Sequence, residues 1–174
     1  MGMQELDVPL DRDLFFRKMI RSFAASLEAT VGADEAAGYV AVVGSEIGEW
    51  IEAEYSKSAG RDSFDPQQIA ELLVDLKRRI GGAFHIISVS DEQILLGNSE
   101  CPFGQLADGQ PALCQMTSNV FGRIAANQLG YARAVLQETI ARGDGQCRIA
   151  INLKADDDDD DDSHEFFKID QPLI

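Results

Sequence analysis

Three cysteines and one glutamate are the residues of this sequence best suited to chemistry. The cysteines are Cys101, Cys114 and Cys147, and the glutamate is Glu138. No two cysteines form a CxxC pair, so their spacing alone is weak evidence for a metal site. Thiolates nevertheless bind zinc ions and iron–sulfur clusters, and the helix start expected at Cys114 favours a thiolate. The remaining question is whether the fold brings these side chains together.

A predicted β-hairpin would place Glu138 beside Cys147. Apolar side chains alternate along 131–140 and 146–153, and the Asp144-Gly dipeptide between them is a strong turn signal. Continuing the alternation puts Glu138 on the core face of its strand, next to Cys147 on the facing strand. A carboxylate among apolar neighbours is costly without a partner, and a divalent cation would supply that partner.

Two cofactors fit three thiolates and one carboxylate. A closed tetrahedral zinc site is the first expectation, with Cys101, Cys114, Cys147 and Glu138 as its ligands. A [4Fe–4S] cluster held by the three thiolates is the alternative. In a third reading the cysteines are independent small hydrophobic residues, and Glu138 pairs with a nearby arginine.

The elements that must position these residues follow from the hydrophobic periodicity. Helical spacing dominates the first half of the chain and strand-like spacing begins near Phe84. This order predicts an α+β fold, with N-terminal helices packed on a mostly antiparallel sheet and a C-terminal helix and β-hairpin. The prediction is one domain over 1–174, with a helical part over 11–82, a strand, cysteine loop, helix and hairpin over 83–153, an acidic loop over 155–163 and a tail strand over 164–170.

The second predicted helix carries Gly38, Gly44 and Gly48 close to its apolar stripe. Such glycines indicate either close packing against another helix or a groove for a ligand or partner helix. A small-molecule pocket is expected where the sheet meets the N-terminal helices. Taken alone, His85 is predicted to be a histidine of the core. The residues expected around the pocket are Tyr39, Trp50, Phe84 and His85.

The composition excludes several classes of partner. The chain has 174 residues, with 15 Lys and Arg against 30 Asp and Glu, and a formal net charge of −15. Seven of those charges lie in the run Asp156–Asp162, which is expected to be a solvated loop. So acidic a chain is a poor partner for nucleic acids or anionic membranes. Without a secretory signal and with an odd number of cysteines, it is expected in the cytoplasm.

The second half of the sequence resembles a known family. The resemblance rests on Cys101-Pro-Phe-Gly, on Pro111-Ala-Leu-Cys114 with the helix after it, and on Gly130 to Cys147, which includes Glu138 and Gly143-Asp. These segments resemble the methanogen output domain family, small modules found alone or attached to sensor proteins. They are more distantly similar to four-vinyl-reductase-type domains, whose glutamate, Gly-Asp and cysteines bind zinc. A cysteine of that pattern is replaced by Ala141, and Cys101 is expected to substitute for it.

The resemblance implies a regulatory sensor or output module rather than an enzyme. Such a module would contain a cysteine-liganded metal or iron–sulfur site, would bind a small molecule in the pocket between the sheet and the N-terminal helices, and would signal to a protein partner. A homodimer is expected through the first helix, whose apolar surface is wide. Two alternatives stay open: a small cysteine- or metal-dependent enzyme with Cys114 as nucleophile and Glu138 or His85 as base, and a thiol redox switch.

Overall fold

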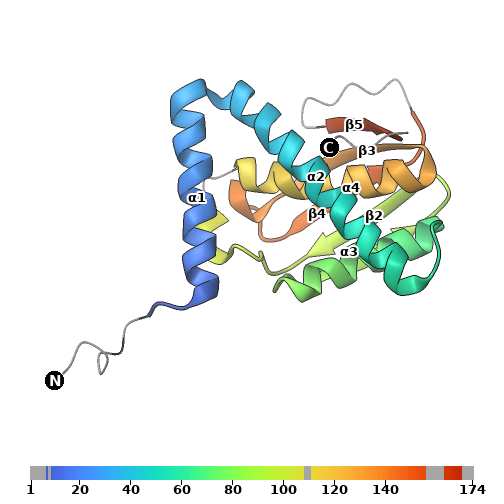
Figure 1. The fold of residues 1–174 in the computed structure, drawn as a ribbon, viewed down its shortest axis with the longest axis horizontal. Coiled ribbons are helices and arrows are strands. Elements are labelled where there is room, and N and C mark those ends of the chain that lie inside the picture. The colour runs from blue at the N-terminus through green and yellow to red at the C-terminus, as the bar shows by residue number, and fades with distance from the viewer. Residues whose placement is uncertain (1–6, 8, 108–110, 156–162, 170–174) are drawn as a thin grey trace.

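The fold is α+β, as the sequence predicts (Figure 1). The computed structural model describes residue 7 and the ranges 9–107, 111–155 and 163–169. The acidic run Asp156–Asp162 therefore lies outside the described residues. The described residues form four α-helices, which are α1 (Arg12–Val31), α2 (Ala33–Ala59), α3 (Pro66–Arg79) and α4 (Pro111–Leu129).

The helix boundaries follow from local chemistry. Asp11 caps α1 by accepting a hydrogen bond from the Leu14 amide. Gly32, with φ +91°, joins α1 to α2 in a conformation that residues with a side chain rarely adopt. Asp65 and Gln68 form a reciprocal capping box at the start of α3. The predicted starts of these helices are thus confirmed.

A five-stranded antiparallel sheet forms the second layer. Its spatial order is β1-β2-β4-β3-β5, so the predicted tail strand lies at one edge, beside β3. The β3–β4 pairing confirms the predicted hairpin. The strands are β1 (Phe84–Val89), β2 (Gln93–Asn98), β3 (Tyr131–Glu138), β4 (Cys147–Asn152) and β5 (Ser163–Phe167), with short 3₁₀ turns η2 (Gly104–Ala107) and η3 (Ile140–Arg142).

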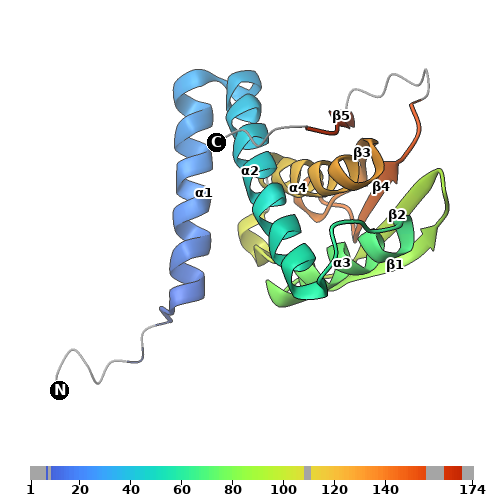
Figure 2. The same cartoon turned by 45° about the vertical axis from the view of Figure 1, so that its right-hand side comes forward.

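The main core lies between one face of this sheet and helices α2, α3 and α4. Helix α4 runs across the sheet, whereas α1 stands at the edge of the molecule beside α2 (Figures 1 and 2). No residue of α1 is buried. The largest fully buried side chains are Phe121, Ile69, Leu73, Ile94, Leu96, Ile124, Ile149 and Ile151. Helix α1 therefore contributes no buried side chain to this core.

Two glycines let α2 and α4 approach closely, as the packing alternative predicts. A Cβ atom on Gly44 would lie 2.5 Å from the Cβ of Asn119, and one on Gly48 would lie 3.1 Å from Arg123. Gly38, near the start of α2, has nothing within 4 Å of that position. The interface between these helices therefore requires two of the three glycines.

We expect Gly44→Ala to destabilise the fold, because the added methyl group has no room against Asn119. Overpacking of this kind costs about 1–3 kcal/mol. Gly38→Ala in the same helix is the matched control, and it should gain roughly 0.5–1 kcal/mol from helix propensity. Urea unfolding measures both changes. Equal effects of the two substitutions would contradict the close packing of α2 on α4.

Within the described ranges, no helix combines the length and apolar character needed to cross a membrane.

Candidate cysteine-lined site

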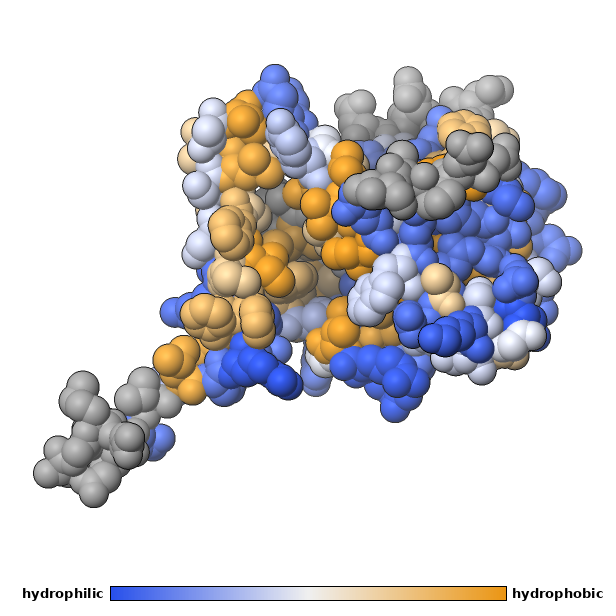
Figure 3. Space-filling view, in the orientation of Figure 1, coloured by the Kyte–Doolittle hydropathy of each residue, from blue (hydrophilic) through white to orange (hydrophobic). Residues whose placement is uncertain are grey.

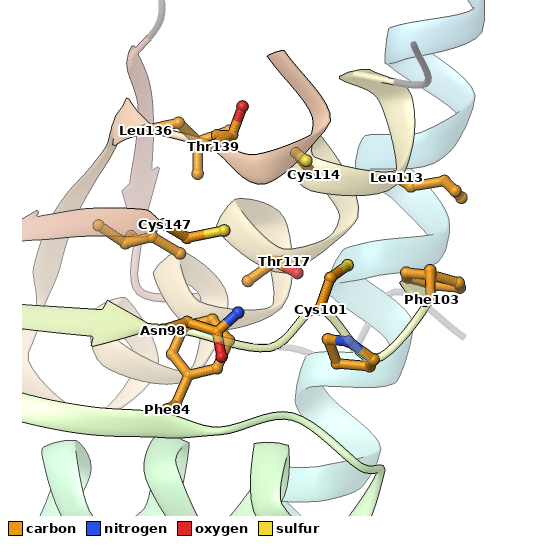
Figure 4. Close-up of a pocket in the computed structure, with 12 residues that line it drawn as sticks. Phe84, Asn98, Cys101, Phe103, Leu113, Cys114, Thr117, Leu136, Thr139 and Cys147 are labelled. Carbon is orange, nitrogen blue, oxygen red and sulfur yellow. The ribbon is translucent and has the colours of Figure 1, made fainter. Parts of the chain in front are cut away.

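The three cysteines line one small cavity (Figure 4). Cys101 comes from the loop after β2, Cys114 from the first turns of α4, and Cys147 from the start of β4. Their thiols point toward the same space of about 30 Å³, and none forms a disulfide. Three segments that are distant in sequence therefore deliver sulfur atoms to one place.

The turn between β3 and β4 directs hydrogen-bond donors at two of these sulfurs. The backbone amide of Ile140 donates to Cys147 Sγ at 3.5 Å. Hydrogen bonds from the Ala141 amide and the Thr139 hydroxyl lower the pKa of Cys114. The Thr139 hydroxyl is buried and has no oxygen or nitrogen partner in the described part of the chain. Donors of this kind favour the thiolate over the thiol.

The Gly143-Asp144 pair explains why this turn has its shape. Asp144 accepts a hydrogen bond from the Thr139 amide at 2.7 Å, and its own amide donates to the Thr139 carbonyl at 3.2 Å. Gly143 has φ +92°, a conformation that favours glycine. The Gly-Asp dipeptide thus holds Thr139 and the two following amides against the cysteine cavity.

Asn98 and Pro102 hold the loop that carries Cys101. The buried Asn98 side chain accepts hydrogen bonds from the amides of Ala83 and Glu100, at 3.1 Å and 3.3 Å. Pro102 packs against Gly82, where a Cβ atom would lie 3.0 Å from the proline ring. These contacts set the position of Cys101 at the mouth of the cavity.

Lys77 is a buried cation beside this cavity. Its side chain, on the last turn of α3, is only 6 % exposed. The ammonium donates to Thr117 Oγ1 at 2.8 Å and lies 5.4 Å and 5.1 Å from the ring centres of Phe84 and Phe121. Burial lowers the pKa of Lys77 to about 8, whereas the negative charge of the three cysteines would raise it. Among the described residues no carboxylate forms an ion pair with it.

Lys77 and Thr139 were not among the residues predicted for the site. A signal for Lys77 was present, because it follows Ile69 and Leu73 at intervals of four residues and so occupies the apolar stripe of α3. Thr139 carried no such signal. Its role depends on the turn geometry that Asp144 sets.

Burial raises the pKa of the Cys101 and Cys114 thiols, that of Cys114 to about 11. The sequence predicted the reverse for Cys114 from its place at a helix start. The helix start and the local donors are outweighed by desolvation and by the neighbouring sulfurs. Without a further positive charge, Cys114 is therefore a thiol at neutral pH, which is unfavourable for a nucleophile.

Glu138 does not line the cavity, although the sequence predicts it beside Cys147 on the inward face of the hairpin. A β-bulge between Leu136 and Glu138 shifts the register, so Glu138 pairs with Arg148 instead of Cys147. Its carboxylate accepts a hydrogen bond from the Gln146 side chain at 2.8 Å. The one-residue shift turns the carboxylate to the other face of the sheet.

The residues predicted for a ligand pocket do not come together. Phe84 lines the cysteine cavity, while Tyr39 lines a second cavity between α1 and the other helices. Trp50 is 64 % exposed on α2. His85 is exposed and covers Gly97 on the far face of the sheet, so its expected place in the core is wrong. Strand alternation explains this, because a Phe84 that faces inward turns His85 outward.

The second cavity is apolar and holds about 370 Å³. Its walls come from all four helices, and Figure 3 shows the apolar side chains of α1 and α2 facing each other across a hollow. Phe103, Leu113 and Thr117 line both this cavity and the cysteine cavity. The two cavities therefore share a wall.

The donor chemistry of the smaller cavity fits a thiophilic metal ion. Three soft sulfur donors surround a space of single-ion size, with amide donors and a buried ammonium nearby. In the described ranges, no group of three or more cysteine, histidine, aspartate or glutamate side chains already has metal-binding geometry. Binding would therefore require the thiols to move closer together, and the metal site stays a prediction.

The fold is that of a small α+β module with a cysteine-lined cavity. A family model described as Methanogen output domain 1 matches residues 19–152. The match covers both cavities and most of the chain, so the protein belongs to the methanogen output domain 1 family, as the sequence resemblance suggested. No curated protein matches the chain. The family description fits a regulatory, output role.

Proposed function

We propose that this protein is a signalling module whose output depends on a zinc ion bound by Cys101, Cys114 and Cys147. The observation that carries the proposal is the meeting of three thiols at one small cavity. Bound zinc would hold the sulfurs as thiolates, which burial alone disfavours. The metal supplies a charge and a fixed geometry, and the chain supplies the donors and their orientation.

The size of the cavity favours a single ion over a [4Fe–4S] cluster. A space of about 30 Å³ accommodates one water-sized group. A cluster needs room for eight iron and sulfur atoms, so the loop, α4 and β4 would have to separate. With Glu138 turned away, the three cysteines leave one coordination position for water or a small exogenous molecule. An open position is typical of zinc sites that exchange ligands.

The cysteine loop offers a route from the site to the first helix. Arg17 of α1 donates a hydrogen bond to the Pro102 carbonyl at 3.4 Å, directly after Cys101. Phe103, the next residue, lies in the wall shared by the two cavities. A change in metal or ligand state that moves Cys101 would therefore move the contacts of α1. Helix α1 is the element best placed to report that change to a protein partner.

A homodimer through α1 and α2 is part of the proposal. Apolar side chains on both helices are exposed, and Figure 3 shows how they gather on one side of the molecule. A second copy would cover them by the two-fold pairing that is commonest in soluble oligomers. The exposed side chains are Phe15, Phe16, Ile20 and Phe23 on α1 and Tyr39, Val42, Val43 and Trp50 on α2.

Metal analysis of protein purified without air tests the proposed cofactor. We expect about one zinc per chain and no visible absorbance. A brown protein that contains iron and sulfide would show that the cofactor is an iron–sulfur cluster instead of zinc. Metal-free protein that forms a disulfide on mild oxidation would instead favour the redox switch. The enzyme alternative has less support, because His85 and Glu138 both lie away from the cysteines.

A further inference from the structure

Lys77 presents a problem of charge that the fold alone does not solve. Its ammonium is buried, has one hydrogen-bond acceptor in Thr117, and lies against the aromatic rings of Phe84 and Phe121. Lys77 also lines the larger apolar cavity. Two of its three N–H donors have no acceptor in the described part of the chain. A buried charge without a counter-ion destabilises a protein, so a lysine is costly here unless an anion arrives.

The cysteine cavity is the place from which that anion can come. Thr117, which accepts the hydrogen bond from the ammonium, and Phe84, whose ring centre lies 5.4 Å from it, both line this cavity. The three cysteines also raise the pKa of Lys77. Three thiolates carry a charge of −3, and a divalent ion reduces it to −1. One ammonium makes the whole site neutral. If a carboxylate were the fourth ligand, the thiolates, metal ion, ammonium and carboxylate together would carry a net buried charge of −1.

We propose that Lys77 is the counter-cation of a metal–tris-thiolate centre, and that the fourth ligand of this centre is a neutral molecule. This inference rests on the proposed function and goes beyond it by giving the net charge of the loaded site. Lys77 is a positioning residue, because it acts on the metal through the thiolates. It also accounts for the absence of Glu138 from the cavity, since a carboxylate there would upset the balance of charge.

The charge-balance argument predicts opposite effects of one substitution on two measurements. Lys77→Met keeps the length and packing of the side chain and removes the charge. Zinc-free protein should become more stable, because an uncompensated buried charge is gone. Zinc affinity should fall by roughly 10–100-fold, the usual cost of losing an outer-shell partner. If Lys77 had only a structural role, Lys77→Met would lower the stability of the fold and leave zinc affinity unchanged.

Two further variants separate charge from hydrogen bonding and test the fourth ligand. Lys77→Gln can keep the hydrogen bond to Thr117 without the charge, and it should lose zinc affinity as Lys77→Met does. Glu138→Gln should bind zinc like the wild type. In the Co²⁺-substituted protein, removal of the cation should move the sulfur-to-cobalt charge-transfer band to longer wavelength. The readouts are competition titration with a chromophoric zinc chelator, thermal unfolding and absorption spectra.

The possible outcomes distinguish this inference from the function on which it rests. Wild-type protein that binds neither zinc nor cobalt overturns both. Wild-type binding together with equally tight binding by Lys77→Met and Lys77→Gln overturns the counter-cation alone. So does a Lys77→Met protein that is less stable than the wild type without metal, or that fails to fold. Loss of zinc binding in Glu138→Gln would overturn the neutral fourth ligand.

Discussion

Cys147→Ser is expected to abolish tight zinc binding and to remove the stabilisation that zinc gives to the fold. Zinc affinity should fall by more than the roughly 10–100-fold that loss of an outer-shell partner costs. At a free zinc concentration 1,000 times its Kd, bound metal stabilises a protein by about 4 kcal/mol. For a chain of this size that corresponds to a Tm shift of about 8–16 °C. Calorimetry with zinc and with a chelator measures the shift in each protein.

The chelator comparison separates metal loss from damage to the core. Cys147 is buried and lies beside Asn98 of β2, so serine also places a hydroxyl where a sulfur was packed. That packing effect is present with and without zinc, whereas the metal effect disappears in chelator. Wild-type and Cys147→Ser proteins that respond equally to the chelator would favour the buried-cysteine interpretation.

Phe15→Glu is expected to convert a dimer into a monomer. Phe15 is 54 % exposed in the first turn of α1 and contacts Phe16 edge-on, within the apolar surface of the first two helices. A second copy would bury this surface, and a carboxylate placed in the interface would lack a partner. Light scattering should give about 38 kDa for the wild type, twice the 19.0 kDa of one chain, and about 19 kDa for the variant.

Ile87→Glu is the matched control for the dimer prediction. Ile87 is another exposed apolar residue, 43 % exposed, but it lies on β1, away from the first two helices. The same charge introduced there should leave the mass at about 38 kDa. A wild-type mass of 19.0 kDa at all concentrations would rule out the dimer, and dissociation by both variants would place the interface elsewhere.

The proposed link between the site and the dimer makes these two experiments informative together. The hydrogen bond from Arg17 to the Pro102 carbonyl connects α1 to the loop that carries Cys101. If zinc state controls the position of this loop, chelation should also change the dimer affinity. The change would be the signal that an output module passes on.

Local chemistry in the sequence was sufficient to predict the elements and their order. Asp11, Gly32, Asp65 and Pro66 begin or end helices through their own side chains or backbone freedom, whatever the rest of the chain does. Alternating apolar residues gave the strands, and their order along the chain gave the α+β class. The three cysteines were recognisable as a set because thiols are the side chains of this chain best suited to bind a soft metal.

Tertiary structure decided which residues share the cavity. The bulge that turns Glu138 away from Cys147 shifts the register by one residue, and nothing in the alternation of side chains reveals where such a shift occurs. The burial of Lys77 depends on α4 and β1 packing over α3, so the sequence showed only a lysine in an apolar stripe. The local structural preferences of side chains depend on residue type and spacing, so they can be predicted from the sequence. Desolvation and the balance of charge depend on all the segments that surround a group, and only the folded chain sets them.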